Sequence, residues 1–175
     1  VKGNIEIGSS VAVTNDGTKK FVLETGSEAS PKFIDIAPVI ANTSVDVNSG
    51  YRRLKKDLQL GTNSKVTVFG SSTLDFGFDN DNAGTLPLHI LRNGSDNGTA
   101  FENITGSVLK ITSPKGIYNI GSPANYTDGN VRVTTRTYNS AATYHYIGKA
   151  NQETGNGLPN AAANKHVIVE LATDS

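Results

Sequence analysis

The stretch VKGNIEIGSSVAV (residues 1–13) alternates along its length between two kinds of position. Its early even positions are polar, such as Lys2, Asn4 and Glu6, whereas its odd positions are apolar or small. A period of two is typical of a strand with one buried face, and a usual strand has only about five or six residues. We therefore predict an N-terminal arm over residues 1–13 and a single domain over residues 14–175. The buried face of the arm would comprise Val1, Gly3, Ile5, Ile7, Ser9, Val11 and Val13.

Short alternating stretches follow along the rest of the chain, separated by clusters of Gly, Asn, Asp, Ser and Pro. Residues 58–60 and 66–68 flank the turn residues 61–64, a pattern that is typical of a β-hairpin. Residues 51–58 fit either a strand or a short helix. About ten short strands at this spacing indicate a sandwich or a barrel, and we see no internal repeat. We predict an all-β fold made of one antiparallel β-sandwich.

Composition limits the classes of function. The chain has 175 residues with 16 basic and 16 acidic side chains, and this neutrality argues against a nucleic-acid-binding protein. It has no Cys, which excludes disulfides and thiolate metal sites. It has no Met, so we expect that a signal peptide was removed and that the protein is secreted or displayed at the cell surface. No apolar run approaches the roughly 20 residues that cross a bilayer, so we expect no membrane insertion.

The sequence contains no recognisable catalytic or metal-binding motif. Its histidines, His89, His145 and His166, are not at metal-ligand spacing. Residues 79–84 (DNDNAG) begin like a calcium loop, but Ile90 stands where the bidentate Glu is needed. We therefore expect no enzymatic activity, no cofactor and no metal.

A basic cluster follows Tyr51 in the sequence. Such a cluster can bind a sulfated glycan, an anionic lipid or an acidic neighbouring subunit. A solvated face that guards an exposed strand is the simpler interpretation, and we favour it. The possible anionic-ligand patch comprises Arg52, Arg53, Lys55 and Lys56.

Two interpretations of the arm remain open from the residues alone. In the first, residues 11–13 pair with residues 21–23 across the turn at residues 15–17, and residues 1–10 only extend this hairpin. In the second, the arm leaves its own domain and fills an apolar groove of a neighbouring subunit by β-strand addition. Alternation, length, small residues and a terminal position suit the second interpretation.

The arm resembles the N-terminal donor strand of the major subunits of chaperone–usher fimbriae, in particular the cysteine-free colonisation-factor type. The chain departs from the family's common Asp-Pro at residues 12–13, which are Ala-Val. The resemblance implies an immunoglobulin-like antiparallel β-sandwich that lacks one strand and is completed by a donor strand from a neighbouring subunit. It also implies identical subunits in a head-to-tail fibre, a periplasmic chaperone and an outer-membrane usher. The residues at matching spacing are Val1, Asn4, Ile5, Ile7, Ser10 and Val11.

We therefore predict a structural subunit of a bacterial surface fibre, a fimbria or pilus, assembled by donor-strand exchange and supporting adhesion. One alternative is a carbohydrate- or receptor-binding β-sandwich module, and another is a structural protein of a virion or phage tail. The binding module would need exposed aromatic side chains, and tyrosines on strands usually pack against the sheet. The candidates are Tyr118, Tyr126, Tyr138, Tyr144 and Tyr146.

Overall fold

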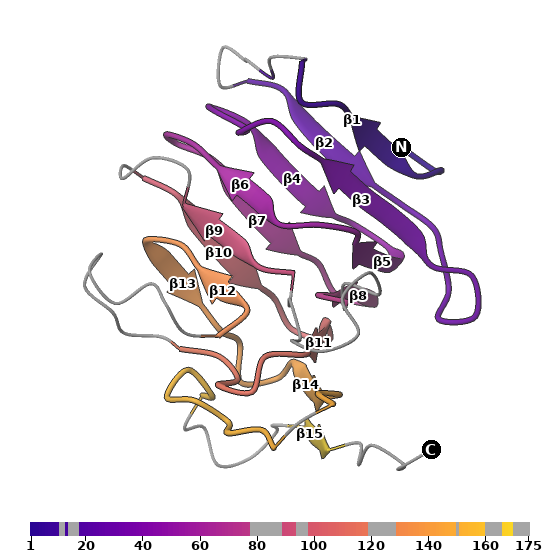
Figure 1. Ribbon diagram of the computed structural model, residues 1–175. Helices are drawn as coiled ribbons and strands as arrows, with labels where there is room; N and C mark the ends of the chain where they lie inside the picture. The colour runs from indigo at the N-terminus through magenta and orange to yellow at the C-terminus, as the bar shows by residue number, and fades with distance from the viewer. Residues whose placement is uncertain are drawn as a thin grey trace.

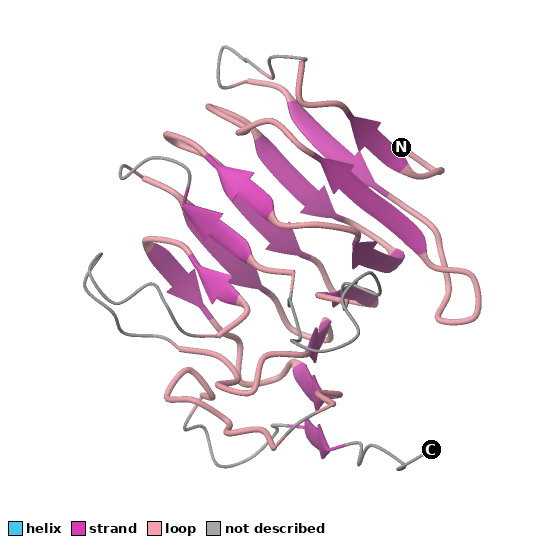
Figure 2. Ribbon diagram, viewed as in Figure 1, coloured by secondary structure: helices cyan, strands magenta, loops and turns pink. Residues whose placement is uncertain are grey.

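The described part of the computed structural model consists of strands and loops (Figure 2). Among these residues no helix is long and apolar enough to cross a membrane. The residues described are 1–10, 13, 18–77, 89–93, 98–118, 129–149, 151–159 and 166–169.

The strands form three sheets, which we name A, B and C (Figure 1). Sheet A contains, in spatial order, β1 (Ile5–Ile7), β3 (Lys32–Ile36), β5 (Gly50–Leu54), β8 (Ser72–Asp75), β11 (Val108–Ile111), β14 (Thr143–Tyr146) and β15 (His166–Val169). Sheet B contains β12 (Val131–Arg132), β9 (Leu91–Asn93) and β6 (Leu58–Leu60). Sheet C contains β13 (Thr135–Thr137), β10 (Ala100–Asn103), β7 (Lys65–Val68), β4 (Ser44–Val47) and β2 (Lys20–Leu23).

All the pairings between these strands are parallel, which overturns the predicted antiparallel, immunoglobulin-like sandwich. The chain visits sheets A, B and C in turn and then returns to sheet A one strand further along. Isolated bridges from Val13 to Ile40 and from Ile40 to Leu60 continue sheet B toward the N-terminus, so that the first two passes of the chain also contribute to it. The fold is therefore a parallel β-solenoid of stacked coils, numbered here from the N-terminus.

The inner faces of the sheets supply a continuous core between the coils. Val45, Val66 and Phe101 lie in register in coils two to four of sheet C, and each is at most 1% exposed. In a strand successive side chains point to opposite faces, so the alternation seen in the sequence fills this core just as it would in a sandwich. Alternation therefore reports burial of one face and carries no information on whether the neighbouring strand is parallel.

The corners between sheets explain the wealth of Asn and Gly. Asn42 and Asn63 have φ of 50° and 53° at successive corners between sheets B and C, and the Asn63 Nδ2 donates to the Asn42 Oδ1 over 3.3 Å. Gly50 has φ of 77° at a corner between sheets C and A, where a Cβ would lie 2.3 Å from the Thr25 carbonyl carbon. Asn and Gly adopt this left-handed backbone more readily than other residues.

Two local expectations change for the same reason. Residues 61–64 do not close a hairpin, because β6 belongs to sheet B and β7 to sheet C. The turn at Asn63 redirects the chain from one sheet to the next, and each strand pairs with a strand one coil away. Of the two alternatives for residues 51–58, the structure has strands, since β5 ends at Leu54 and β6 begins at Leu58.

Candidate functional site

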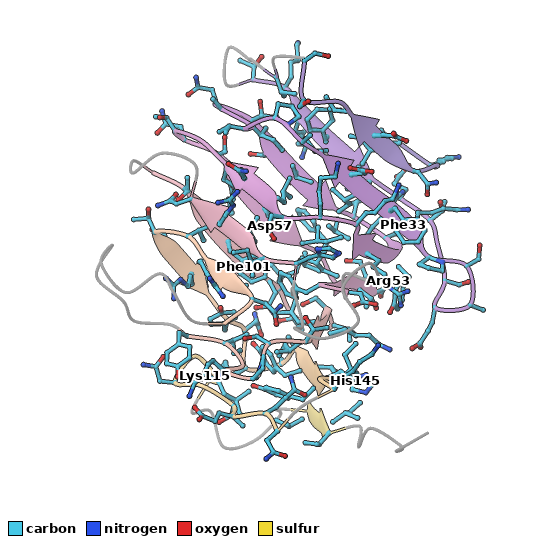
Figure 3. The ribbon with its side chains drawn as sticks, viewed as in Figure 1. Phe33, Arg53, Asp57, Phe101, Lys115 and His145 are labelled. Atoms are coloured by element: carbon cyan, nitrogen blue, oxygen red, sulfur yellow. The ribbon has the colours of Figure 1, made fainter. Side chains whose placement is uncertain are left out.

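The outer face of sheet A carries a row of ionisable side chains, one from each of four successive coils. Figure 3 labels its first and last members, Arg53 and His145. We call this set the charged row. Each member lies between two inward-facing neighbours on its strand, so its side chain points away from the core. Four members at the strand spacing of about 4.8 Å extend over roughly 14 Å along the solenoid. The charged row comprises Arg53 of β5, Asp75 of β8, Lys110 of β11 and His145 of β14.

Asp75 is the centre of the first half of the charged row. Its side chain is fully buried, and its Oδ2 accepts hydrogen bonds from the Tyr51 hydroxyl over 2.5 Å and from the Arg53 Nε over 2.7 Å. Its Oδ1 accepts the Gly77 amide over 2.7 Å. Three donors from two coils therefore converge on one carboxylate, which fixes coil four against coil three.

Lys110 is the centre of the second half. Its side chain is only 7% exposed, and its ammonium group forms an ion pair with Glu28. Glu28 belongs to the loop that leads from β2 to β3, which is the first corner between sheets C and A. The same ammonium lies 5.6 Å from the ring centroid of Tyr51, close enough for a cation–π contact. The loop at residues 24–31 is therefore bound to a strand several coils away.

The electrostatics of the row follow from these contacts. The hydrogen bond from Lys110 lowers the pKa of Glu28, with further attraction from His145 and Arg53, so Glu28 is ionised at neutral pH. Burial and the hydrogen bond to Asp75 raise the pKa of Tyr51 well above its ordinary value, so its hydroxyl stays protonated and donates. Every one of these contacts joins members of the same protein, and together they hold the coils and the loop in place.

The four basic residues predicted as one patch are divided between two faces. Arg52 is fully buried and donates to the main-chain oxygens of Gly3 over 2.6 Å and Val1 over 2.8 Å, and also to that of Glu24. Arg53 points outward into the charged row. Lys55 and Lys56 lie together on the carboxylate of Asp35, at 3.2 and 2.5 Å.

The residues of the predicted arm lie in the first coil. Ile5 and Ile7 pair with Ile34 and Ile36 of the same chain, and Ile5 is only 8% exposed. Val13 bridges to Ile40, and Val1 is half exposed. Gly3 and Ser9 are exposed, and Val11 lies outside the described residues.

Other candidates from the sequence are dispersed. His89 is buried, with its main-chain oxygen accepting from Asn130, whereas His145 belongs to the charged row. Residues 79–84, which begin like a calcium loop, lie outside the described part of the chain. Tyr144 and Tyr146 are buried in the core instead of forming an exposed aromatic surface. Within the described ranges no group of three His, Cys, Asp or Glu side chains is placed to hold a metal ion.

Sequence reasoning missed the charged row. Its members come from residues 53, 75, 110 and 145, with Glu28 added from a loop, and only the register of the coils brings them together. For three of the four members the available signal was the position of the residue between two apolar or aromatic neighbours, as in Leu74-Asp75-Phe76; Arg53 follows Arg52 and lacks this signal. Comparisons of the chain with protein-family models, with curated proteins and with solved structures find no match.

Proposed function

We propose that this protein is a structural rod of a bacterial surface fibre, and that it acts by its shape and rigidity. The observation that carries the proposal is the unbroken parallel stack of sheet A, in which seven strands follow one another along the solenoid. Six strand intervals of about 4.8 Å make this sheet roughly 29 Å long. A solenoid grows in length without widening, which suits a shaft.

The buried polar groups support a role in mechanical cohesion. Asn130 is fully buried, accepts the amides of Thr112 and Ser113 and donates to the His89 main-chain oxygen, so it ties coil five to coil four. Ser64 is also buried and donates to the Ile40 oxygen one coil away. Buried polar groups that are fully hydrogen-bonded rigidify a structure and specify one packing.

The proposal keeps the surface location and the identical partners expected from the sequence. It leaves out the chaperone and the usher, because their action required a sandwich that lacks one strand. It also assigns no catalysis, since Arg53, Asp75 and Lys110 of the charged row are bound to partners within the chain. Adhesion would be a property of the assembled fibre.

Immunogold electron microscopy of cells that produce the protein tests the proposal. Antibodies against the folded chain should decorate filaments on the cell surface, at regular intervals along each filament. Labelling of dispersed soluble material, with bare filaments or none, would overturn the proposed function. Deletion of the coding sequence should remove the labelled filaments and leave other surface structures intact.

The charged row favours one second candidate, a binding face for a charged polymer. Arg53, Lys110 and His145 supply nitrogen atoms from coils three, five and six, and an extended glycan could follow such a row. A glycan array with the wild type and with Lys110→Gln separates the two functions. Binding that the substitution abolishes would support the binding face, and an array without any binding would support the rod alone.

A further inference from the structure

The two ends of sheet A are formed by strands of matching chemistry. β1 is the outermost strand at one end and β15 at the other, so each has one edge without a partner strand among the described residues. Because all pairings in the sheet are parallel, β1 and β15 run in the same direction along it (Figure 1). An open edge offers main-chain N–H and C=O groups for pairing with another strand.

β15 is apolar on both of its faces and is exposed. Val167, Ile168 and Val169 are 39, 47 and 64% exposed, and they account for three of the five exposed large hydrophobic residues of the described chain. Val167 and Val169 lie in register with Tyr144 and Tyr146, which are buried in the core. They therefore occupy inward positions of the stack, whose next layer would cover them.

At this end of the solenoid, residues 152–158 stack on the preceding coil. The Ile117 amide donates to the Thr154 oxygen over 3.2 Å, and the Gly157 amide donates to the Ile117 oxygen over 2.9 Å. Leu158 packs against the core. Residues 152–158 thus stack on coil five without forming a strand, and the strand edge at this end of the described chain belongs to sheet A.

We propose that the β15 edge of one copy of this protein pairs in parallel with the β1 edge of a second copy, so that sheet A continues from copy to copy. This inference rests on the proposed rod function and names its partner surface. Ile5 and Val169 are the two ends of one inward row of sheet A, so continuing that row places Ile5 of the second copy on Val169. Apolar side chains then meet apolar side chains, as they do between coils.

The pairing uses two different edges, so it is heterologous. A heterologous contact that does not close into a ring produces a filament. The occupant is a second copy because β1 already presents a parallel edge of the same sheet with the inward positions filled by isoleucines. An unrelated extended peptide could form main-chain hydrogen bonds with the open edge of β15. It would add only one strand, however, and would not continue sheet A or its rows of inward side chains any further.

The absence of Cys from the chain makes the register directly testable. In the proposed pairing Ile168 faces Asn4 of the next copy, because the two residues end the same outward row within one copy, and both side chains are exposed. Neighbouring strands lie about 4.8 Å apart, within the range of Cα separations that a disulfide spans. The variant Ile168→Cys/Asn4→Cys should therefore form a ladder of disulfide-linked oligomers after mild oxidation, resolved on a non-reducing gel.

The matched control moves one cysteine by two residues on the same strand face. Ile168→Cys/Glu6→Cys should give at least ten times less crosslinking, because the two sulfur atoms are out of register. Equal crosslinking of both variants would overturn the proposed register. Retention of the wild-type melting temperature in each variant would exclude misfolding as the cause of any difference.

A second measurement follows self-association without any crosslink. The mass of the wild type measured by light scattering should rise with concentration, whereas Val169→Lys should stay monomeric because it places a charge between the stacked layers. Val39→Lys is the matched control, since Val39 is 40% exposed and lies outside both edge strands. A monomeric wild type, or equal association of Val169→Lys, would overturn the inference.

These outcomes are separate from those that test the proposed function. Labelled surface filaments together with a monomeric, uncrosslinked protein would sustain the fibre and overturn this interface. In-register crosslinking without labelled filaments would sustain the interface and overturn the surface-fibre function.

Discussion

Replacing Asp75 by Asn tests whether the charged row stabilises the solenoid. The amide has nearly the same shape as the carboxylate, but one of its two terminal atoms donates instead of accepting. Asp75 receives the Tyr51 hydroxyl and the Arg53 Nε on one oxygen and the Gly77 amide on the other. In either orientation the Nδ2 of the new residue therefore faces a donor, and at least one hydrogen bond is lost.

The size of the effect follows from burial. Removing one partner of a buried ion pair costs about 3–5 kcal/mol. The Arg53 side chain is 37% exposed and can regain water, so we reduce the expected loss to about 2–4 kcal/mol. For a domain of this size each kcal/mol corresponds to roughly 2–4 °C in Tm, so a loss of 3 kcal/mol lowers Tm by about 6–12 °C.

Urea unfolding followed by circular dichroism measures this loss directly. Asp46→Asn is the matched control, because Asp46 lies on a strand of sheet C and forms an ion pair with the half-exposed Lys20. That pair should contribute no more than about 1 kcal/mol. If Asp75→Asn and Asp46→Asn destabilise the protein equally, the charged row has no special role in stability.

Three further predictions concern pH and the backbone. The hydrogen bond from Lys110 lowers the pKa of Glu28 below its ordinary value of 4.5, so the stabilisation is complete above about pH 4.5 and is lost as pH falls through the lower folded pKa. Glu28→Gln should reduce this acid dependence in urea titrations between pH 7 and pH 2. Gly50→Ala should destabilise the protein by at least about 1 kcal/mol in urea unfolding, because a Cβ at this position would overlap Thr25. Gly8→Ala is the control: the space around Gly8 is open, so this substitution should change stability by less than about 0.5 kcal/mol. Burial raises the pKa of four tyrosines, that of Tyr144 to about 12; the four are Tyr51, Tyr138, Tyr144 and Tyr146. The free energy of unfolding should therefore fall as pH rises above about 10. At pH 11 the folded chain should show at most about a third of the tyrosinate absorbance at 295 nm that the unfolded chain shows.

The strands could be predicted from the sequence, but their partners could not. Leu58, Leu60, Val66 and Val68 lie in strands with their side chains buried, as alternation predicts. Antiparallel and parallel sheets bury one face through the same period of two, so alternation cannot separate them. The turn residues between these strands were equally ambiguous, because a left-handed Asn serves both a hairpin and a solenoid corner.

A repeat of 21 residues was the missed signal for the parallel fold. Asn42-Thr43-Ser44-Val45-Asp46-Val47 matches Asn63-Ser64-Lys65-Val66-Thr67-Val68, with each position shifted by 21. The two segments form equivalent corners and strands of successive coils, as the pairing of Val45 with Val66 shows. A period of this length is typical of stacked supersecondary units. Two copies are few, and the later coils do not keep the period.

The loss of the period explains why the charged row could not be predicted. Ile34 pairs with Leu54, 20 positions later, whereas Leu74 pairs with Leu109, 35 positions later. Most of the extra residues come between β8 and β9 in the sequence, and a longer connection costs little because loop-closure entropy grows slowly with length. Side chains that become neighbours across coils therefore have no fixed separation in the sequence. A charged row of this kind can be derived only once the pairing of each strand is known. The pairing must also be known before β1 and β15, on which the proposed filament depends, can be identified as the edge strands of sheet A.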